Sequence, residues 1–288
     1  MGSVEMRQEM RQRNSKTSRF NPFQPGNGCE NPTMKTQRIG TVHLVGAGPG
    51  DPELLTLRAA RLLRDCAVVV YDHLVGEGVR QLIGKHVRQV YVGKEAGRHT
   101  LPQEDINTLL VDLATEGLDV VRLKGGDPYI FGRGGEEIEQ LVAHGIPCEV
   151  VPGITAASGM SAYAGIPLTH RDFAQACIFV TGHLQDDTVD LDWPTLARPH
   201  QTVVVYMGLA ALDEICRQMI AHGLSDHTPA AVVRHATLPD QQVLTGTLAS
   251  LPQAVKAAAL SSPALIIVGE VVTLHDRLQP AHQRTINS

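Results

Sequence analysis

Residues 41–63, TVHLVGAGPGDPELLTLRAARLL, decide the fold class. TVHLV predicts a buried strand, GAGPGDP a glycine-rich turn, and ELLTLRAARLL a helix. We expect Asp51 to cap that helix and Pro52 to occupy its first position. The apolar face of the helix would comprise Leu54, Leu55, Leu57, Leu62 and Leu63. A strand, a glycine-rich turn and a helix in this order are typical of a parallel α/β fold.

The same alternation continues along the chain. Further strands are expected at 66–72, 86–93, 119–126 and 147–153, with helices at 101–117, 134–145 and 154–165. After a break near 166–173, a second α/β unit is expected, with strands at 175–183, 202–208, 229–236, 242–248 and 263–272 and a helix over 209–222. The segments 229–236 and 242–248 are so close in sequence that they predict antiparallel pairing. The fold class is therefore α/β, with a mostly parallel N-terminal sheet and a mixed C-terminal sheet.

These patterns divide the chain into domains. We predict a disordered tail over 1–37, an N-terminal α/β domain over 38–168, a C-terminal α/β domain over 169–280 and a short tail over 281–288. The first segment is polar and Arg-rich and lacks apolar periodicity, so it cannot bury enough surface to offset the entropy of ordering. A cloning remnant or solvated tail is favoured over a transit peptide, because Glu5 and Glu9 interrupt it.

Composition excludes several classes of function. The chain of 288 residues carries a formal net charge of −5, so it lacks the global basic field of a nucleic-acid-binding protein. Five cysteines without a C-x-x-C pair and 13 histidines without metal-ligand spacing predict no metal site. Reduced thiols indicate a cytoplasmic location. No apolar run reaches the roughly 20 residues that span a bilayer, so no membrane association is expected.

The glycine-rich turn GAGPGDP does not by itself identify the ligand that it would bind. Gly46 and Gly48 match the first two positions of the dinucleotide pattern G-x-G-x-x-G, but its last position is Asp51. The charge of Asp51 and the missing N–H of Pro52 both oppose a pyrophosphate there. Asp72 nevertheless ends the second strand 24 positions after Gly48, about where a ribose-binding acid lies in Rossmann proteins. A nicotinamide-dependent oxidoreductase therefore stays open.

The second turn, KGGDPYIFGRGGEE (124–137), is denser in glycine and charge. It lacks the G-K-[ST] ending of a P-loop. A carboxylate and free carbonyls at a strand end suit a positively charged ligand with hydroxyls better than a phosphate. Ligands of open α/β sheets bind outside the carboxyl ends of the strands, where both turns are expected to lie.

Six stretches in consistent order carry a resemblance to a known family. They are GAGPGDPELLT, YDHLV (71–75), VGK (92–94), RLKGGDPYIFGRGGEE (122–137), VPGITAASGMSAYAGIPLTHR (151–171) and VVYMG (204–208). Together they closely resemble the uroporphyrinogen-III C-methyltransferases, which are S-adenosylmethionine-dependent tetrapyrrole methylases. The resemblance runs from about residue 39 to 275.

The resemblance implies a homodimer of two α/β domains of the tetrapyrrole methylase type, with S-adenosyl-L-methionine in the inter-domain cleft. Such an enzyme methylates C2 and C7 of its substrate, uroporphyrinogen III, to give precorrin-2 and S-adenosyl-L-homocysteine. The product would feed sirohaem, cobalamin or haem d1 synthesis. No metal is needed, since the methyl donor is a sulfonium.

Carried over by motif, the implied cofactor contacts are Pro49, Gly125, Gly126, Asp127, Ile130, Thr155, Ala156, Met207 and Ala236. Ala236 stands where relatives commonly have glycine. The resemblance also suggests Asp72 as proton acceptor and Lys94 as donor. Asp72 has the alternative task of capping the following segment, and Lys94 that of a solvated surface charge.

The substrate has eight carboxylates, which suit arginine forks. Arg133 and Arg171 are the leading candidates, because Arg133 lies between glycines and Arg171 follows a proline-bearing loop. Other candidates in basic stretches are Lys94, Arg98, His99 and His170. Glu136 could accept a pyrrole N–H, act as a base, or only complement the helix dipole.

Three rival functions stay open. A methylase of the same superfamily could act on a later corrin precursor, a translation factor or ribosomal RNA. An oxidoreductase built on the opening turn and Asp72 would bind NAD. A non-catalytic binding module accounts poorly for glycine turns so dense in charged groups.

Overall fold

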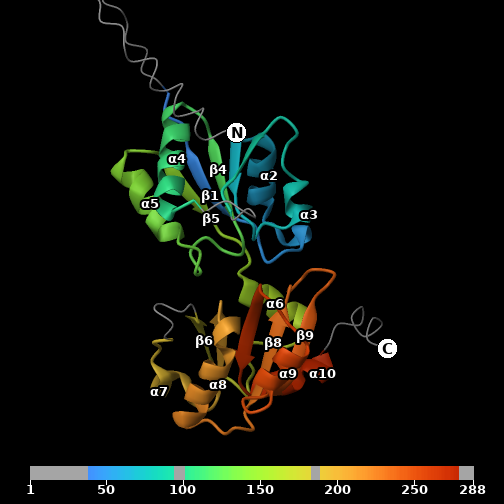
Figure 1. Ribbon diagram of the computed structural model, residues 1–288. Coiled ribbons are helices and arrows are strands. Elements are labelled where there is room, and N and C mark those ends of the chain that lie inside the picture. Colours follow the sequence, from blue (N-terminus) through green and yellow to red (C-terminus); the bar gives the residue numbers. More distant parts are fainter. Residues whose placement is uncertain (1–37, 94–100, 183–188, 279–288) are drawn as a thin grey trace, which may run out of the picture. The chain divides into compact units, whose positions relative to one another are not determined.

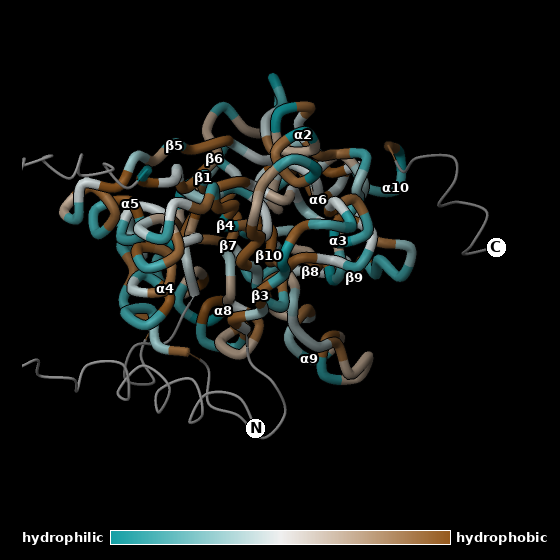
Figure 2. The backbone as a smooth tube through the Cα atoms, turned by 90° about the horizontal axis from the view of Figure 1, so that it is seen from above, coloured by the Kyte–Doolittle hydropathy of each residue, from teal (hydrophilic) through white to brown (hydrophobic). Residues whose placement is uncertain are grey.

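The computed structural model describes residues 38–93, 101–182 and 189–278. They form two α/β units, each built on one five-stranded sheet (Figure 1). Hydrophobic stretches, brown in Figure 2, coincide with strands such as β1 (Val42–Gly46), β4 (Val120–Lys124) and β10 (Ala264–Val268). The predicted fold class is confirmed. The tails over 1–37 and 281–288 lie outside the described residues, and the domain boundaries stay predictions.

The first sheet is entirely parallel. Its strands are β1 (Val42–Gly46), β2 (Val68–Tyr71), β3 (Arg88–Tyr91), β4 (Val120–Lys124) and β5 (Cys148–Val151). Their order is β3-β2-β4-β1-β5, so β4 is central between β2 and β1. Parallel pairing brings the carboxyl ends of all strands to the same edge of the sheet.

Helices cover both faces of this sheet. They are α2 (Leu57–Asp65), α3 (Glu77–Arg80), α4 (Gln103–Thr115) and α5 (Gly134–Ala143). Buried side chains of α2 and α3 pack with Val69 and Val121, whereas those of α4 and α5 pack with Val68 and Val120. Successive strand residues point to opposite faces, so these are two separate cores on the two sides of the sheet.

The second sheet is mixed, as predicted. Its strands are β6 (Ala176–Thr181), β7 (Gln201–Tyr206), β8 (Pro229–Arg234), β9 (Gln242–Thr247) and β10 (Ala264–Val268). Their order is β6-β7-β10-β8-β9. Strands β6 and β7 are parallel, and the remaining pairs, β8 with β9 included, are antiparallel. The strand predicted over 263–272 ends at Val268, because Gly269 has a φ of 142° and a 3-10 helix, η3 (Glu270–Leu274), follows.

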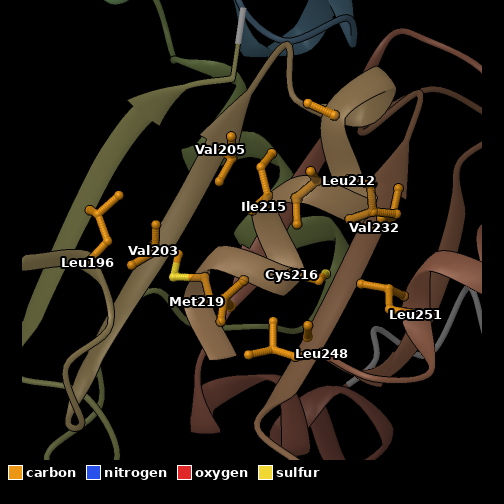
Figure 3. Packing of buried hydrophobic residues seen from close by; sticks show 14 of the residues in the cluster. Leu196, Val203, Val205, Leu212, Ile215, Cys216, Met219, Val232, Leu248 and Leu251 are labelled. Carbon is orange, nitrogen blue, oxygen red and sulfur yellow. The ribbon is translucent and has the colours of Figure 1, made fainter. Parts of the chain in front are cut away.

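Short helices also cover both faces of the second sheet. One face packs α7 (Trp193–Leu196), α8 (Leu212–Ala221) and α9 (Leu251–Ala257), and Figure 3 shows Ile215 and Met219 of α8 among Val203, Val205 and Leu248. The other face packs α6 (Ala156–Ala164) and η3, followed by α10 (His275–Leu278). Helix α6 thus follows β5 of the first sheet in the chain but is buried against the second sheet. No described helix is long and apolar enough to cross a bilayer.

The helix predicted over 53–63 begins later than expected. The Asp51 carboxylate accepts a hydrogen bond from Glu53 N at 2.9 Å, but it caps only a 3-10 turn, η1 (Pro52–Leu54). Thr56 is the N-cap of α2, with its hydroxyl accepting a main-chain hydrogen bond from the first turn. Two successive capping residues therefore divide the segment into a turn and a helix.

The later start also changes which leucines face the core. Leu63 and Ala59, four residues apart on one helix face, are fully buried. Leu57 is 92% exposed, so its expected place on the apolar face is wrong.

A line of buried charges lies on the α4–α5 face of β4. The Arg122 and Lys124 side chains are 4% and 6% exposed, and both pair with Oε1 of fully buried Glu137, at 3.2 and 2.9 Å. Gln103 donates to the same oxygen at 3.0 Å. Arg122 also reaches Asp72, with 3.0 Å between Nη2 and Oδ2. We call Asp72, Arg122, Lys124 and Glu137 the buried charge network.

The buried charge network is costly to desolvate. Burial and the neighbouring charge of Arg122 lower the pKa of Lys124, against the opposing effect of Glu137. Oε2 of Glu137 has no hydrogen-bond partner within the described part of the chain. Glu137 is thus the anion that both central cations share, and its removal would leave two buried positive charges close together.

We therefore expect Glu137→Gln to lower the free energy of unfolding by about 3–5 kcal/mol, because uncompensated buried charges carry that penalty. Urea unfolding followed by circular dichroism at pH 7 measures the change. The matched control is Glu136→Gln, since Glu136 is 52% exposed and pairs only at the surface. That control should change stability by less than about 1 kcal/mol. Equal small losses in both variants would contradict the role assigned to Glu137.

Candidate active site at the glycine-rich strand ends

The turns that follow β1, β4 and β5 meet through main-chain and carboxylate contacts. Gly48 N donates to Gly126 O at 3.1 Å, and Gly126 N donates to Gly48 O at 2.7 Å. Oδ2 of Asp127 accepts from Gly153 N at 3.0 Å, while its Oδ1 accepts from Tyr129 N at 2.8 Å. Asp127 therefore ties the turn after β4 to the turn after β5. Its predicted contact with a cofactor stays a prediction.

Glycine is required where these turns meet. A Cβ atom on Gly153 would lie 2.2 Å from Gly126 O, and one on Gly46 would lie 2.5 Å from Gly153 N. Gly126 also has a φ of 66°, in the left-handed region that glycine adopts without strain. The three turns thus approach one another as bare main chain.

The first turn is also attached to α6 and to the segment after β8. Pro49 lies against Gly159 of α6, where an added Cβ would be 2.5 Å from the proline Cγ. Asp51 N donates to Thr237 Oγ1 at 3.1 Å, and Asp51 Oδ2 accepts from the Tyr163 hydroxyl at 2.5 Å. This hydrogen bond raises the pKa of Tyr163 to about 12. The position of Pro49 is therefore set by contacts from both α/β units.

Left-handed backbone occurs repeatedly next to the predicted site positions. Five non-glycine residues there have φ between 50° and 70°: Phe131, Arg133, Met207, His235 and Thr237. Met207 is itself a predicted cofactor contact, and Ala236 lies between two of the others. Such conformations cost about 1–3 kcal/mol each and concentrate at functional sites. Their positions support the predicted site at the strand ends.

Sequence reasoning missed the role of Tyr206, the last residue of β7. Its hydroxyl lies 2.6 Å from Thr155 Oγ1 and accepts from Ala157 N at 3.1 Å, at the start of α6. The Phe131 ring packs on it with a centroid distance of 4.8 Å. Burial raises the pKa of Tyr206. A tyrosine in a buried strand needs a hydroxyl partner, and this rule was the available signal.

Thr155 and Ala156, both predicted cofactor contacts, lie where α6 begins, and the Tyr206 hydroxyl is hydrogen-bonded to Thr155 and to Ala157, on either side of Ala156. Gly125, another predicted contact, has no room for a side chain, since an added Cβ would lie 2.8 Å from Leu74 Cβ. These closely packed positions leave main chain, rather than large side chains, at the strand ends.

Large apolar side chains are nevertheless exposed beside this main chain. They follow β2, β4 and β7 and comprise Leu74 (53% exposed), Tyr129 (57%), Ile130 (37%), Phe131 (39%) and Met207 (52%). Exposed apolar side chains gathered at strand ends are typical of ligand-binding surfaces. Two surface hollows, of about 410 and 420 Å³, lie elsewhere, beside α8–α9 and α4–α5, and neither is lined by a predicted site residue.

Arg133 and Glu136, two predicted site residues, lie together on the surface. Nε and Nη2 of Arg133 donate to the two carboxylate oxygens of Glu136, at 2.8 and 2.6 Å. The arginine hydrogen bond holds the pKa of Glu136 below its usual range, which weakens Glu136 as a base. Both side chains are more than half exposed and so accessible to a ligand. Their contact with substrate stays a prediction.

Among the described residues, the other charged candidates form no ion pair with Arg133 or Glu136. Arg171 is exposed and forms no ion pair within 38–93, 101–182 and 189–278, whereas the His170 ring accepts from Asp172 N at 3.2 Å. Lys94, with the basic stretch through His99, lies outside the described residues.

Asp72 follows β2 and uses both carboxylate oxygens. Oδ1 accepts from Leu74 N at 3.0 Å, as its predicted capping alternative requires, and Oδ2 faces Arg122. Its role as proton acceptor stays a prediction. Sequence reasoning assigned no role to Arg122 or Glu137, although two cations in the otherwise apolar VVRLK strand were an available signal.

Comparisons with known proteins place the chain in a family. Residues 41–252 match the family of tetrapyrrole (corrin/porphyrin) methylases. The siroheme synthase of Nitrosospira multiformis is 64% identical over 239 residues, which cover 83% of this chain and 51% of that protein. The chain thus spans about half the length of the curated relatives that it matches.

Solved structures agree as well. The uroporphyrin III C-methyl transferase of Thermus thermophilus is 43% identical, with a TM-score of 0.69 over 82% of this chain and 100% of that one. A structure of the Thermus thermophilus enzyme with S-adenyl homocysteine is 42% identical, with a TM-score of 0.69 over 81% of this chain and 93% of that one. Among the described residues, no cluster of histidine, cysteine or carboxylate side chains could hold a metal ion. From the match over residues 41–252, we conclude that the chain belongs to the tetrapyrrole (corrin/porphyrin) methylase family.

Proposed function

We propose that this chain transfers methyl groups from S-adenosyl-L-methionine to C2 and C7 of uroporphyrinogen III, giving precorrin-2. The observation that carries the proposal is its 42% identity, over 81% of its length, with a methyltransferase whose structure holds S-adenyl homocysteine. The joined glycine turns at the strand ends of this chain support the same conclusion.

The strand-end turns suit a phosphate-free cationic cofactor. Pro49 has no N–H to offer a phosphate, and the carboxylates of Asp51 and Asp127 repel anions. S-adenosylmethionine supplies an electrophilic methyl group on a positively charged sulfur. The residues that would hold it are Pro49, Gly125, Gly126, Asp127, Ile130, Thr155, Ala156, Met207 and Ala236. A dinucleotide would meet the same carboxylates with negative phosphates, which disfavours the oxidoreductase alternative.

The exposed side chains suit the proposed acceptor. Uroporphyrinogen III combines an apolar macrocycle with eight carboxylates. Phe131 and Ile130 are partly exposed and offer apolar contact, while Arg133 and Arg171 offer charge-assisted hydrogen bonds of about 1.5–3 kcal/mol each. Substrate carboxylates would compete with Glu136 for Arg133, because that exposed ion pair is weak.

Proton transfer accompanies methylation, since the pyrrole carbon becomes nucleophilic as a proton leaves the macrocycle. We propose Asp72 as the acceptor of that proton and Lys94 as a donor. The Asp72 side chain lies directly after β2 and is 21% exposed. A positioned acid or base contributes about 10²–10⁴-fold to such a reaction.

Two further proposals rest on the family resemblance, namely assembly as a homodimer and use of the product in sirohaem, cobalamin or haem d1 synthesis. The siroheme synthase relatives favour sirohaem synthesis among these pathways. A cytoplasmic location is proposed from the cysteine pattern, which indicates reduced thiols.

The direct test is anaerobic incubation of the pure protein with S-adenosylmethionine and uroporphyrinogen III. We expect S-adenosylhomocysteine and a dimethylated tetrapyrrole, identified by mass spectrometry. Calorimetry should show binding of S-adenosylhomocysteine and none of NAD. If S-adenosylhomocysteine binds but no tetrapyrrole is methylated, a different acceptor is indicated. NAD binding without S-adenosylhomocysteine binding would contradict the proposal entirely.

Arg133→Ala should lower kcat/KM for uroporphyrinogen III by about 10- to 100-fold, because a charge-assisted hydrogen bond to a substrate carboxylate is lost. The affinity for S-adenosylhomocysteine should not change. Arg217→Ala is the matched control, since Arg217 forms the same bidentate surface pair, with Glu214 on α8. Equal kinetics in both variants would remove Arg133 from the site.

A further inference from the structure

We propose that Arg122 is a positioning residue that fixes the Asp72 carboxylate for proton transfer, and that Glu137 in turn fixes Arg122. The inference rests on the proposed function, in which Asp72 accepts a proton. It assigns a task to the buried charge network, of which Arg122, Lys124 and Glu137 are buried behind the strand ends and Asp72 is partly exposed.

Asp72 is held by one donor on each oxygen. Leu74 N donates to Oδ1 and Arg122 Nη2 donates to Oδ2, both at 3.0 Å. The two donors come from different parts of the fold, the turn after β2 and the neighbouring strand β4. Together they oppose rotation of the carboxylate about its side-chain bond. Of these two hydrogen bonds to the Asp72 carboxylate, only the one from Leu74 N would remain without Arg122.

Arg122 is itself immobilised. Its Nε donates to Glu137 Oε1 at 3.2 Å, and its Nη1 donates to Leu123 O at 2.9 Å. With Nη2 on Asp72, all three nitrogens of the planar guanidinium are engaged. A lysine at this position offers one ammonium group and cannot reproduce three contacts in fixed directions. Any movement of Glu137 or Arg122 is therefore transmitted to Asp72.

The fold alone does not require charge at this position. The neighbouring strand residues Val120, Val121 and Leu123 are fully buried, and an apolar side chain at position 122 would continue this core. Replacing buried ion pairs with apolar groups is often neutral or stabilising. The buried charge network is formally neutral, with Arg122 and Lys124 opposite Asp72 and Glu137. Neutrality permits its burial, and the bond to the partly exposed Asp72 gives it a task in the site.

The test is a double-mutant cycle of Arg122→Gln and Asp72→Asn, measured both as kcat and as the free energy of unfolding. Arg122→Gln should lower kcat by about 10- to 100-fold, since a small misplacement of a reacting group has that effect. The affinity for S-adenosylhomocysteine should stay within about twofold of the wild type. In the Asp72→Asn background, the same change should lower kcat by less than about threefold, because Arg122 acts through Asp72.

Two further variants complete the design. Arg122→Lys keeps the charge and replaces Arg122→Gln in the cycle if the latter does not fold. Arg38→Gln is the control, because Arg38 forms an exposed pair with Asp119 at 2.6 Å. This substitution should leave kcat unchanged.

Equal losses of kcat in the wild-type and Asp72→Asn backgrounds would overturn the proposal. If the wild type methylates no uroporphyrinogen III, the proposed function fails, and the unfolding cycle still tests the contact. Unfolding energies that add independently would show that Arg122 does not hold Asp72. Coupled unfolding energies together with coupled kcat values are the expected result.

Discussion

The arrangement of the turns at the strand ends depends on the two hydrogen bonds that the Asp127 carboxylate accepts from main-chain N–H groups. Parallel pairing brings the carboxyl ends of β1, β4 and β5 to the same edge of the sheet, but it does not determine the conformation of the turns that follow. Asp127 does so by accepting hydrogen bonds from Tyr129 N and Gly153 N, beside the reciprocal pair of Gly48 and Gly126. The absence of side chains on the glycines then allows the turns to approach as main chain. The proposed cofactor surface is the outcome of these contacts.

The segment from β4 to α5 separates two kinds of charge. Glu136 and Glu137 are adjacent, but consecutive helix residues point about 100° apart. Glu137 therefore turns inward to Arg122, while Glu136 turns outward to Arg133. The inner pair is desolvated and rigid, which suits the positioning of Asp72. The outer pair is hydrated and weak, which suits exchange with the carboxylates of a substrate.

Sequence predicted the two sheets and the family, because buried runs and glycine turns are local signals. It predicted less well where two local signals compete, as when Thr56 rather than Asp51 begins the first helix. It did not predict contacts between segments far apart in the chain, such as Tyr206 with Thr155 and Arg122 with Asp72. Those pairs depend on strand order and on which helix covers which face, and neither is encoded in a short motif.

The most direct test of this account is a calorimetric titration of Asp127→Asn with S-adenosylhomocysteine. An amide has one acceptor oxygen for the two main-chain donors that Asp127 now satisfies. The account predicts a folded protein, by circular dichroism, whose affinity for S-adenosylhomocysteine is at least about tenfold lower, since one charge-assisted hydrogen bond of roughly 1.5–3 kcal/mol no longer holds the turns. An affinity equal to that of the wild type would contradict it.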